Sequence, residues 1–431
     1  MYDQLLLSTQ VIVLDIRLKR TKPNLRTNEA VLAEAINLAK AIHLNVVYSQ
    51  TILINKFSAA ALISMGHIDK ISEIINQHKI ELVIVNQTLS PIQQRNLEKA
   101  WKCKVIDRTG LILEIFASRA QTSEGKLQVE LASLTYQKSR LVKSWTHLER
   151  QRGGFGFLGG PGESQLEIDR RLISERIDYI KKELSTVQRT RLLQRRSRQK
   201  SEYPLIALVG YTNSGKSTLF NLLTASKVLS KDQLFATLDP TMRAVILPST
   251  RTIILSDTVG FISELPTLLI AAFRATLEEV LEADYIIHVI DSTHEDVIAQ
   301  KNDVYHVLDE LGIHHVVKDN ILECYNKIDI LSNEKKVEIE NENNLENNKI
   351  FISALTGEGV HALLSKIDDY LSLDEKIMEY HLEYKDSSQI AWLYKYGQVL
   401  NRIDYDDFCY IKVKMSPANI QRFGHKQISK K

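Results

Sequence analysis

The sequence predicts an α/β protein of several domains with a long helical hairpin near its middle. The chain has 431 residues, a length that suits two to four domains of ordinary size. Short β-branched runs alternate with amphipathic stretches in residues 1–120 and again in 201–373, as in parallel sheets covered by helices. Between these regions, apolar residues recur at spacings of four and three, which indicates long paired helices.

The composition excludes several broad classes. Hydrophobic residues make up 44% of the chain and charged residues 25%, so disorder and fibrous repeats are not expected. The 55 basic and 53 acidic residues leave a net charge of +2, which does not by itself indicate a nucleic-acid partner. The three cysteines lie far apart without metal-ligand spacing, so neither a disulfide framework nor a zinc site is predicted.

The chain shows no sequence feature of export or membrane insertion. Its start lacks the basic segment and long apolar region of a secretory signal, and no run approaches 18 apolar residues. We expect a reducing, cytoplasmic location.

Residues 1–120 are expected to form a small α/β domain with a largely parallel sheet. The predicted strands and helices alternate along the chain, and only residues 50–66 fit neither periodicity well. Strands are expected at 11–14, 46–48, 82–85 and 105–106, and helices at 28–43, 68–77 and 91–101.

Residues 121–200 are expected to form an antiparallel two-helix hairpin. Apolar seams run from Leu127 to Leu148 and from Leu166 to Val187, broken only at Lys138 and Arg170. The connecting loop, 153–164, carries six glycines within ten residues. Glycine lets another backbone approach closely, and exposed aromatics would be a liability in a simple connector, so the loop suits contact with a large partner.

A basic run follows in the second helix. Residues 181–200 contain eight basic side chains and one acidic side chain, Glu183. Such a run can be a solvated helix end, but beside an exposed loop it also suits phosphate backbones. Nucleic-acid contact is favoured, and the residues expected to make it are Gly153, Gly154, Phe155, Gly156, Phe157, Arg195 and Arg196.

The third domain, 201–373, carries a phosphate-binding loop. A buried strand at 205–209 leads into Gly210-Tyr-Thr-Asn-Ser-Gly-Lys-Ser217 and then into an apolar helix. Backbone N–H groups of such a loop surround the β-phosphate, Lys216 is expected to reach the β- and γ-phosphates, and Ser217 to bind Mg²⁺. The nucleotide-binding residues predicted here are Gly210, Tyr211, Thr212, Asn213, Ser214, Gly215, Lys216, Ser217 and Thr218.

Two further segments complete a predicted guanine-nucleotide site. Asp257-Thr258-Val259-Gly260 follows a strand, so Asp257 is expected to hold Mg²⁺ through water and the Gly260 N–H to sense the γ-phosphate. In Asn326-Lys-Ile-Asp329, Asp329 can accept hydrogen bonds from guanine N1–H and the 2-amino group, which adenine does not offer. Asn326 is expected to brace the loop, and Lys327 to cover the base. Ser353, Ala354 and Leu355 supply a backbone N–H for guanine O6.

Taken together, these motifs give the chain a clear resemblance to the HflX family of P-loop GTPases. Beyond the GTPase motifs, the resemblance rests on six stretches spread over most of the chain. They are Pro91-Ile-Gln-Gln-Arg-Asn-Leu97, Asp107-Arg-Thr-Gly110, Gln128-Val-Glu-Leu131, Gly160-Pro-Gly-Glu-Ser-Gln165, Asp169-Arg-Arg171 and Phe235-Ala-Thr-Leu-Asp-Pro240. It implies a Ras-like G domain, an N-terminal α/β domain with a helical hairpin, and a small C-terminal α/β domain at 374–431.

The resemblance also implies residue roles in GTP hydrolysis. Thr237 would belong to switch I and complete the Mg²⁺ shell with Ser217, with Thr241 as the alternative, so the catalytic residues are Lys216, Thr237 and Gly260. Asn213 would help to hold K⁺. Phe261 stands where many Ras-like enzymes carry a water-orienting Gln, which predicts slow intrinsic hydrolysis.

The resemblance implies a monomeric GTPase that binds the large ribosomal subunit and dissociates stalled or idle ribosomes. The alternative is a GTP-dependent RNA-binding factor in large-subunit assembly that does not separate ribosomes. A signalling switch with a protein partner is disfavoured by the glycine loop and its basic neighbour. Two departures from the family pattern are 59–67, which lacks the usual Gly-Lys-Gly-Lys run, and the short basic end at 425–431.

Overall fold

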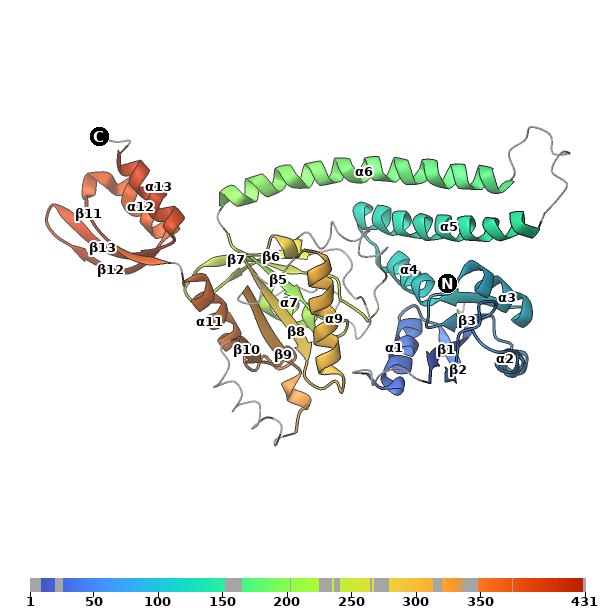
Figure 1. Cartoon of the computed structure of the whole chain (residues 1–431). Helices are drawn as coiled ribbons and strands as arrows, with labels where there is room; N and C mark the ends of the chain where they lie inside the picture. The colour runs from blue at the N-terminus through green and yellow to red at the C-terminus, as the bar shows by residue number, and fades with distance from the viewer. Residues whose placement is uncertain are drawn as a thin grey trace, which may run out of the picture. The chain divides into compact units, whose positions relative to one another are not determined.

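The computed structural model describes residues 9–19, 26–151, 165–201, 203–224, 235, 241–263, 266, 279–312, 320–332, 334, 336, 348–373 and 375–428. Two compact units make up the chain (Figure 1). The first runs over Met1–Arg243 and Ile254–Thr356, and the second over Ala244–Ile253 and Gly357–Lys431. None of the helices in the described part of the chain combines the length and apolarity that a bilayer crossing needs.

The first unit begins with a four-stranded parallel sheet in the order β2-β1-β3-β4. The predicted alternation of strands and helices is present, and β2 extends into the segment whose periodicity was ambiguous. The strands are β1 (Gln10–Leu18), β2 (Asn45–Ile54), β3 (Leu82–Val85) and β4 (Lys104–Asp107), and the helices are α1 (Asn28–Lys40), α2 (Met65–His78), α3 (Pro91–Trp101) and α4 (Arg108–Arg119).

Both faces of this sheet are buried. Val11 and Val13 of β1 pack in one apolar cluster, whereas Ile12 and Leu14 pack in another on the opposite face. Because both faces are covered, the strands are continuous apolar runs and not alternating ones. This is why they are recognisable as core strands from sequence.

The two long helices pair as an antiparallel hairpin. Helix α5 spans Ser123–Gln151 and helix α6 spans Gln165–Ser201 (Figure 1, cyan-green and green). Ile177 and Ile180 of the predicted α6 seam are buried. Helix α5 has a second buried face that the seam did not predict, because Val129 and Ala132 pack in the same cluster as helix α4.

A second sheet carries the predicted phosphate-binding loop, with strand order β10-β9-β8-β5-β7-β6. Strand β5 runs parallel to both β7 and β8, and β8, β9 and β10 continue in parallel. The strands are β5 (Leu205–Val209), β6 (Thr241–Ile246), β7 (Thr252–Asp257), β8 (Tyr285–Asp291), β9 (Ile321–Asn326) and β10 (Lys349–Phe351), with helices α7 (Lys216–Thr224) and α9 (Val297–Glu310) and the short helix η2 (Ile328–Ile330). The fold is thus α/β with a Ras-like G domain.

The second unit contains a three-stranded antiparallel sheet in the order β11-β13-β12. Alternate residues of the central strand, Cys409, Ile411, Val413 and Met415, are buried and pack with Phe423. The elements are α11 (Val360–Leu371), β11 (Lys376–Glu383), η3 (Tyr384–Asp386), α12 (Ser387–Tyr396), β12 (Gln398–Asp404), β13 (Phe408–Met415) and α13 (Pro417–Ile428).

Candidate guanine-nucleotide site

The loop between β5 and α7 depends on two glycines. Gly210 and Gly215 have φ angles of 153° and 96°, which side chains rarely adopt. A β-carbon on Gly210 would lie 2.2 Å from the Val289 carbonyl oxygen, and one on Gly215 would lie 2.1 Å from Asn326 Nδ2. The two glycines therefore allow both the backbone conformation of the loop and the close approach of Val289 and Asn326 to it.

Polar groups converge inside this loop. Lys216 is buried, and its ammonium group donates to the carbonyl oxygens of Gly210, at 3.1 Å, and Tyr211, at 2.8 Å. Burial lowers the pKa of Lys216 to about 8, although the nearby Asp257 carboxylate opposes this shift. The buried hydroxyl oxygens of Thr212 and Ser214 have no hydrogen-bond partner among the described residues. Such groups suit a phosphate ligand.

Asp257 lies at the end of β7 beside the first residues of helix α7. The Ser217 hydroxyl donates to Asp257 Oδ2 at 2.8 Å, and Asp257 is fully buried. Mg²⁺ prefers oxygen donors of this kind and is usually held by one or two protein oxygens together with substrate phosphates. The donor set of these two residues therefore fits Mg²⁺.

The segment after β7 lies directly against the phosphate-binding loop. Thr212 N–H donates to the Phe261 carbonyl oxygen at 2.7 Å, and Phe261 N–H donates to the Gly210 carbonyl oxygen at 3.1 Å. A β-carbon on Gly260 would lie 3.1 Å from Lys216 Nζ, so Gly260 borders the lysine. The two predicted phosphate-sensing residues are thus adjacent.

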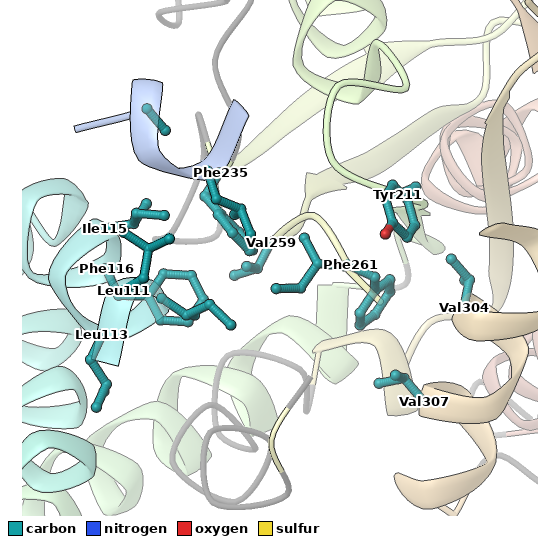
Figure 2. Packing of buried hydrophobic residues seen from close by; sticks show 14 of the residues in the cluster. Leu111, Leu113, Ile115, Phe116, Tyr211, Phe235, Val259, Phe261, Val304 and Val307 are labelled. Atoms are coloured by element: carbon teal, nitrogen blue, oxygen red, sulfur yellow. The ribbon is translucent and has the colours of Figure 1, made fainter. Parts of the chain in front are cut away.

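The Phe261 side chain is buried in an apolar cluster (Figure 2). It is 2% exposed and shares the cluster with Tyr211, Val259 and residues of helices α4 and α9. Phe116 of α4 meets Phe235 in an edge-to-face contact with ring centroids 4.7 Å apart. Thr258, the other residue of this motif, donates to the Leu208 carbonyl oxygen at 2.6 Å.

The base-specificity segments meet the loop from the opposite side. Asn326 Nδ2 donates to the Ser214 carbonyl oxygen at 2.9 Å, and Asn326 Oδ1 accepts from Ala354 N–H at 2.8 Å. The Ser353 hydroxyl donates to Asp329 Oδ1 at 2.6 Å. One amide side chain therefore bridges the phosphate loop and the segment after β10, while Leu355 is 78% exposed.

Sequence reasoning missed one residue at this end of the site. Asp291, the last residue of β8, accepts from Lys327 Nζ at 2.7 Å and from the Thr293 hydroxyl at 2.6 Å. Lys327 has a left-handed φ of 68°, so both its backbone and its side chain are constrained. The available signal was an acid at the carboxyl end of a buried strand, the same signal that identified Asp257.

Several predicted residues cannot be placed. Thr237 and the loop residues Gly153, Gly154, Phe155, Gly156 and Phe157 lie outside the described residues. Arg195 and Arg196 lie in helix α6, but their side chains are also outside the description. Asn213, the predicted K⁺ ligand, is exposed, with a left-handed φ of 61°.

Four family models match successive parts of the chain. Their descriptions are GTP-binding GTPase N-terminal at 29–117, GTP-binding GTPase Middle Region at 119–198, 50S ribosome-binding GTPase at 205–327 and HflX C-terminal domain at 338–428.

Curated relatives and a solved structure are also similar to the chain. A GTPase HflX from Magnetococcus marinus is 48% identical over 394 residues, covering 91% of this chain and 90% of the relative. The GTPase HflX of Escherichia coli is 48% identical over 310 residues, or 71% of each chain. A crystal structure of a GTP-binding protein from Sulfolobus solfataricus with GDP is 27% identical, with a TM-score of 0.44, and covers 84% of this chain and 98% of that one.

Proposed function

Because the chain belongs to the HflX family of GTPases and hydrolyses GTP, we propose that it binds the large ribosomal subunit and dissociates stalled or idle ribosomes. Hydrolysis of GTP to GDP and phosphate then releases the protein. The observation that carries the proposal is the match of residues 205–327 to the family of 50S ribosome-binding GTPases. The long hairpin, with its glycine loop and basic helix α6, supplies a surface for ribosomal RNA.

The phosphate end of the site positions the nucleotide for hydrolysis. The N–H groups of the loop from Gly210 to Gly215 face the β-phosphate, and Lys216 exchanges its two carbonyl partners for phosphate oxygens. Ser217, and Asp257 through a water, would hold Mg²⁺, which would neutralise phosphate charge there, and Thr237 would complete its shell. Gly260, beside Lys216, donates its N–H to the γ-phosphate.

Guanine specificity follows from the opposite end of the site. Asp329, held by Ser353, accepts from guanine N1–H and the 2-amino group, and Lys327 covers the base. The Ala354 N–H already donates to Asn326 Oδ1, so this hydrogen bond is shared or exchanged when guanine O6 binds. Adenine offers neither donor, so its binding would deprive the Asp329 carboxylate of both hydrogen bonds to the base.

Slow intrinsic hydrolysis follows from Phe261. Its side chain has no hydrogen-bonding group and is buried in an apolar cluster, so it cannot orient the attacking water. A large partner or a rearranged switch supplies the missing group. Asn213 would contribute to a K⁺ site beside the phosphates, and equal hydrolysis rates in K⁺ and Na⁺ would remove that role.

Gradient sedimentation tests the proposed function. Intact ribosomes are incubated with the protein and GTP, GDP or a non-hydrolysable GTP analogue, and each fraction is probed for the protein. We expect free subunits with GTP or the analogue but not with GDP, and protein on the large subunit. Binding to the large subunit without dissociation would favour an assembly factor, and absence of co-sedimentation would contradict both functions.

A further inference from the structure

The carboxyl edge of the N-terminal sheet has the topology of a binding site. The order β2-β1-β3-β4 places a topological switch point between β1 and β3, where doubly wound sheets usually bind ligands. Asp15 of β1 is fully buried there and accepts from Asn86 Nδ2 and Gln87 Nε2, each at 3.0 Å. Asn86 Oδ1 in turn accepts from Arg108 at 2.7 Å, which aims the arginine outward from this edge.

Arg108 and Glu34 bind the segment that follows the Gly260 motif. Arg108 donates to the Ser263 carbonyl oxygen at 2.8 Å and to its hydroxyl oxygen at 3.0 Å. The Ser263 hydroxyl donates to Glu34 Oε1 at 2.7 Å, and Glu34 also pairs with Arg108. Thus this edge, where other doubly wound sheets bind a small ligand, holds Ser263, which belongs to the segment that begins at Asp257 and that we call switch II.

The phosphate-binding loop joins the same network through Tyr211. The Tyr211 hydroxyl oxygen accepts from Ser263 N–H at 2.7 Å and from Arg26 at 3.3 Å, and the hydroxyl donates to Glu34. Arg26 also pairs with Asp303 of helix α9. All three polar groups of Ser263, namely N–H, C=O and hydroxyl, are therefore bound.

The charge state of the network is defined. Burial favours a neutral Glu34, but Arg108 and the hydrogen bonds from Ser263 and Tyr211 outweigh it and lower the pKa of Glu34. Burial and the Glu34 charge raise the pKa of Tyr211. An ionised acceptor therefore faces neutral hydroxyl donors, which gives strong, directional hydrogen bonds.

The residue before Arg108 anchors the hairpin. Asp107 is fully buried and accepts from the Tyr136 hydroxyl and from Arg140 of helix α5, each at 2.6 Å. The same carboxylate accepts the N–H groups of Leu89, at 3.1 Å, and Gly110, at 2.9 Å. Asp107 thus binds the hairpin, and the next residue, Arg108, binds switch II.

We infer that the Asp107–Arg108 junction couples the nucleotide state of switch II to the helical hairpin. Gly260 lies three residues before Ser263 and borders Lys216, so a γ-phosphate bound by both would act directly on the segment that holds Ser263. Ser263 and Arg108 move together or lose their hydrogen bonds. Either change reaches Asp107, and through it Tyr136 and Arg140. Arg108 and Glu34 are therefore positioning residues for switch II, and the inference extends the proposed function, in which the hairpin contacts the ribosome.

Hydrogen exchange on the full-length protein, with GDP or a non-hydrolysable GTP analogue and without ribosomes, tests the coupling. In the wild type we expect the analogue to change amide exchange at Leu89 and Gly110 and in residues 127–141 by about fivefold or more, the lower end of typical allosteric coupling. Arg108→Gln should abolish the nucleotide dependence of amide exchange at Leu89, at Gly110 and in residues 127–141. Tyr136→Phe should keep it at Gly110 and weaken it in helix α5, where Arg140 stays bound to Asp107.

Two further variants make the result decisive. If Arg108→Gln destabilises the domain, Ser263→Ala, which removes only one hydroxyl, still tests the coupling. The nucleotide dependence of amide exchange in Ser263→Ala should be smaller than that in the wild type. Arg176→Gln removes an exposed ion pair with Glu130 and should respond as the wild type does. The inference would be overturned if amide exchange in the wild-type hairpin did not depend on the nucleotide. It would also be overturned if Arg108→Gln or Ser263→Ala kept the full nucleotide dependence of the wild type. Because no ribosome is present, failure of ribosome binding would leave this result unaffected.

Discussion

At the residue scale, the site depends on side chains that orient other side chains. Asp291 holds the Lys327 ammonium group at 2.7 Å, and the Ser292 hydroxyl donates to the Asn326 carbonyl oxygen at 2.6 Å. The residues at the end of β8 therefore support both halves of the base-recognition motif. The aliphatic stem of Lys327 can stay over a base only if its ammonium group is fixed by Asp291, because an unrestrained lysine samples many rotamers.

Asp291→Ala should weaken binding of both GDP and GTP. Loss of a charged but partly exposed hydrogen bond should cost about 1 kcal/mol, or roughly fivefold in affinity. Titration with a fluorescent guanine nucleotide measures the change. Asp309→Ala, which removes an exposed carboxylate from helix α9, is the matched control, and equal affinities for the two variants would refute the role of Asp291.

Lys216 makes nucleotide binding depend on pH. Its pKa is lowered to about 8 in the free protein, and bound phosphate favours the charged form. Binding therefore takes up a proton above about pH 8, and affinity should fall as pH rises, by at most about tenfold per pH unit, with no contribution from this group below that pH. Nucleotide titrations from about pH 7 to 9 test this. In Lys216→Ala, any remaining change of affinity with pH comes from other titrating groups, such as the base. A pH dependence equal to that of the wild type would show that Lys216 is not its source.

At the element scale, the turn between β5 and α7 and the strand β9 form one structural unit. Asn326, at the end of β9, occupies the space that a side chain at position 215 would need. The turn thus requires glycine for its conformation and for the approach of a neighbouring element. Although β8 lies between β5 and β9 in the sheet, Asn326 at the end of β9 reaches the loop that follows β5.

Gly215→Ala should disrupt nucleotide binding without unfolding the chain. The left-handed conformation and the clash with Asn326 should together cost at least about 2 kcal/mol, or roughly 30-fold in GDP affinity. Isothermal titration of GDP gives the affinity. Gly66→Ala, at a position with no neighbouring atom within 4 Å, should bind as the wild type does, and similar affinities for both variants would contradict the account.

At the scale of the whole molecule, one compact unit holds the N-terminal sheet, the hairpin and the residues of the nucleotide site. A partly buried network, from Asp303 through Arg26 and Glu34 to Arg108, joins the N-terminal and G domains. Ion pairs of this kind are costly to break because each leaves a buried charge uncompensated. With the coupling that we infer through Asp107, contacts at the far end of the hairpin would influence hydrolysis without touching the nucleotide.

Replacement of Gly153, Gly154 and Gly156 with Val should separate the two activities. GTP affinity should remain unchanged, whereas binding to the large ribosomal subunit should fall about tenfold or more, because each side chain blocks close backbone approach. Co-sedimentation with purified large subunits at increasing protein concentration measures the loss. Replacement of Gly66 with Val controls for added apolar volume, and unchanged subunit binding by the loop variant would eliminate the contact role.

The sequence by itself determined the features that are local or periodic. The phosphate loop is contiguous and lies between a strand and a helix, so its identity and its strand context were predictable, as were the paired helices and the parallel N-terminal sheet. The role of Thr237 and the ribosomal contacts stay predictions, because those residues or their side chains lie outside the described parts of the chain.

Only the tertiary structure decided which distant side chains meet. Glu34 and Ser263 are 229 positions apart, and no periodicity relates them, because strand order and helix placement bring them together. Helix α5 shows the same limit: its seam predicted one buried face, but Val129 and Ala132 are buried by helix α4. Apolar spacing shows that a face is buried, whereas the element that covers it depends on how the whole chain folds.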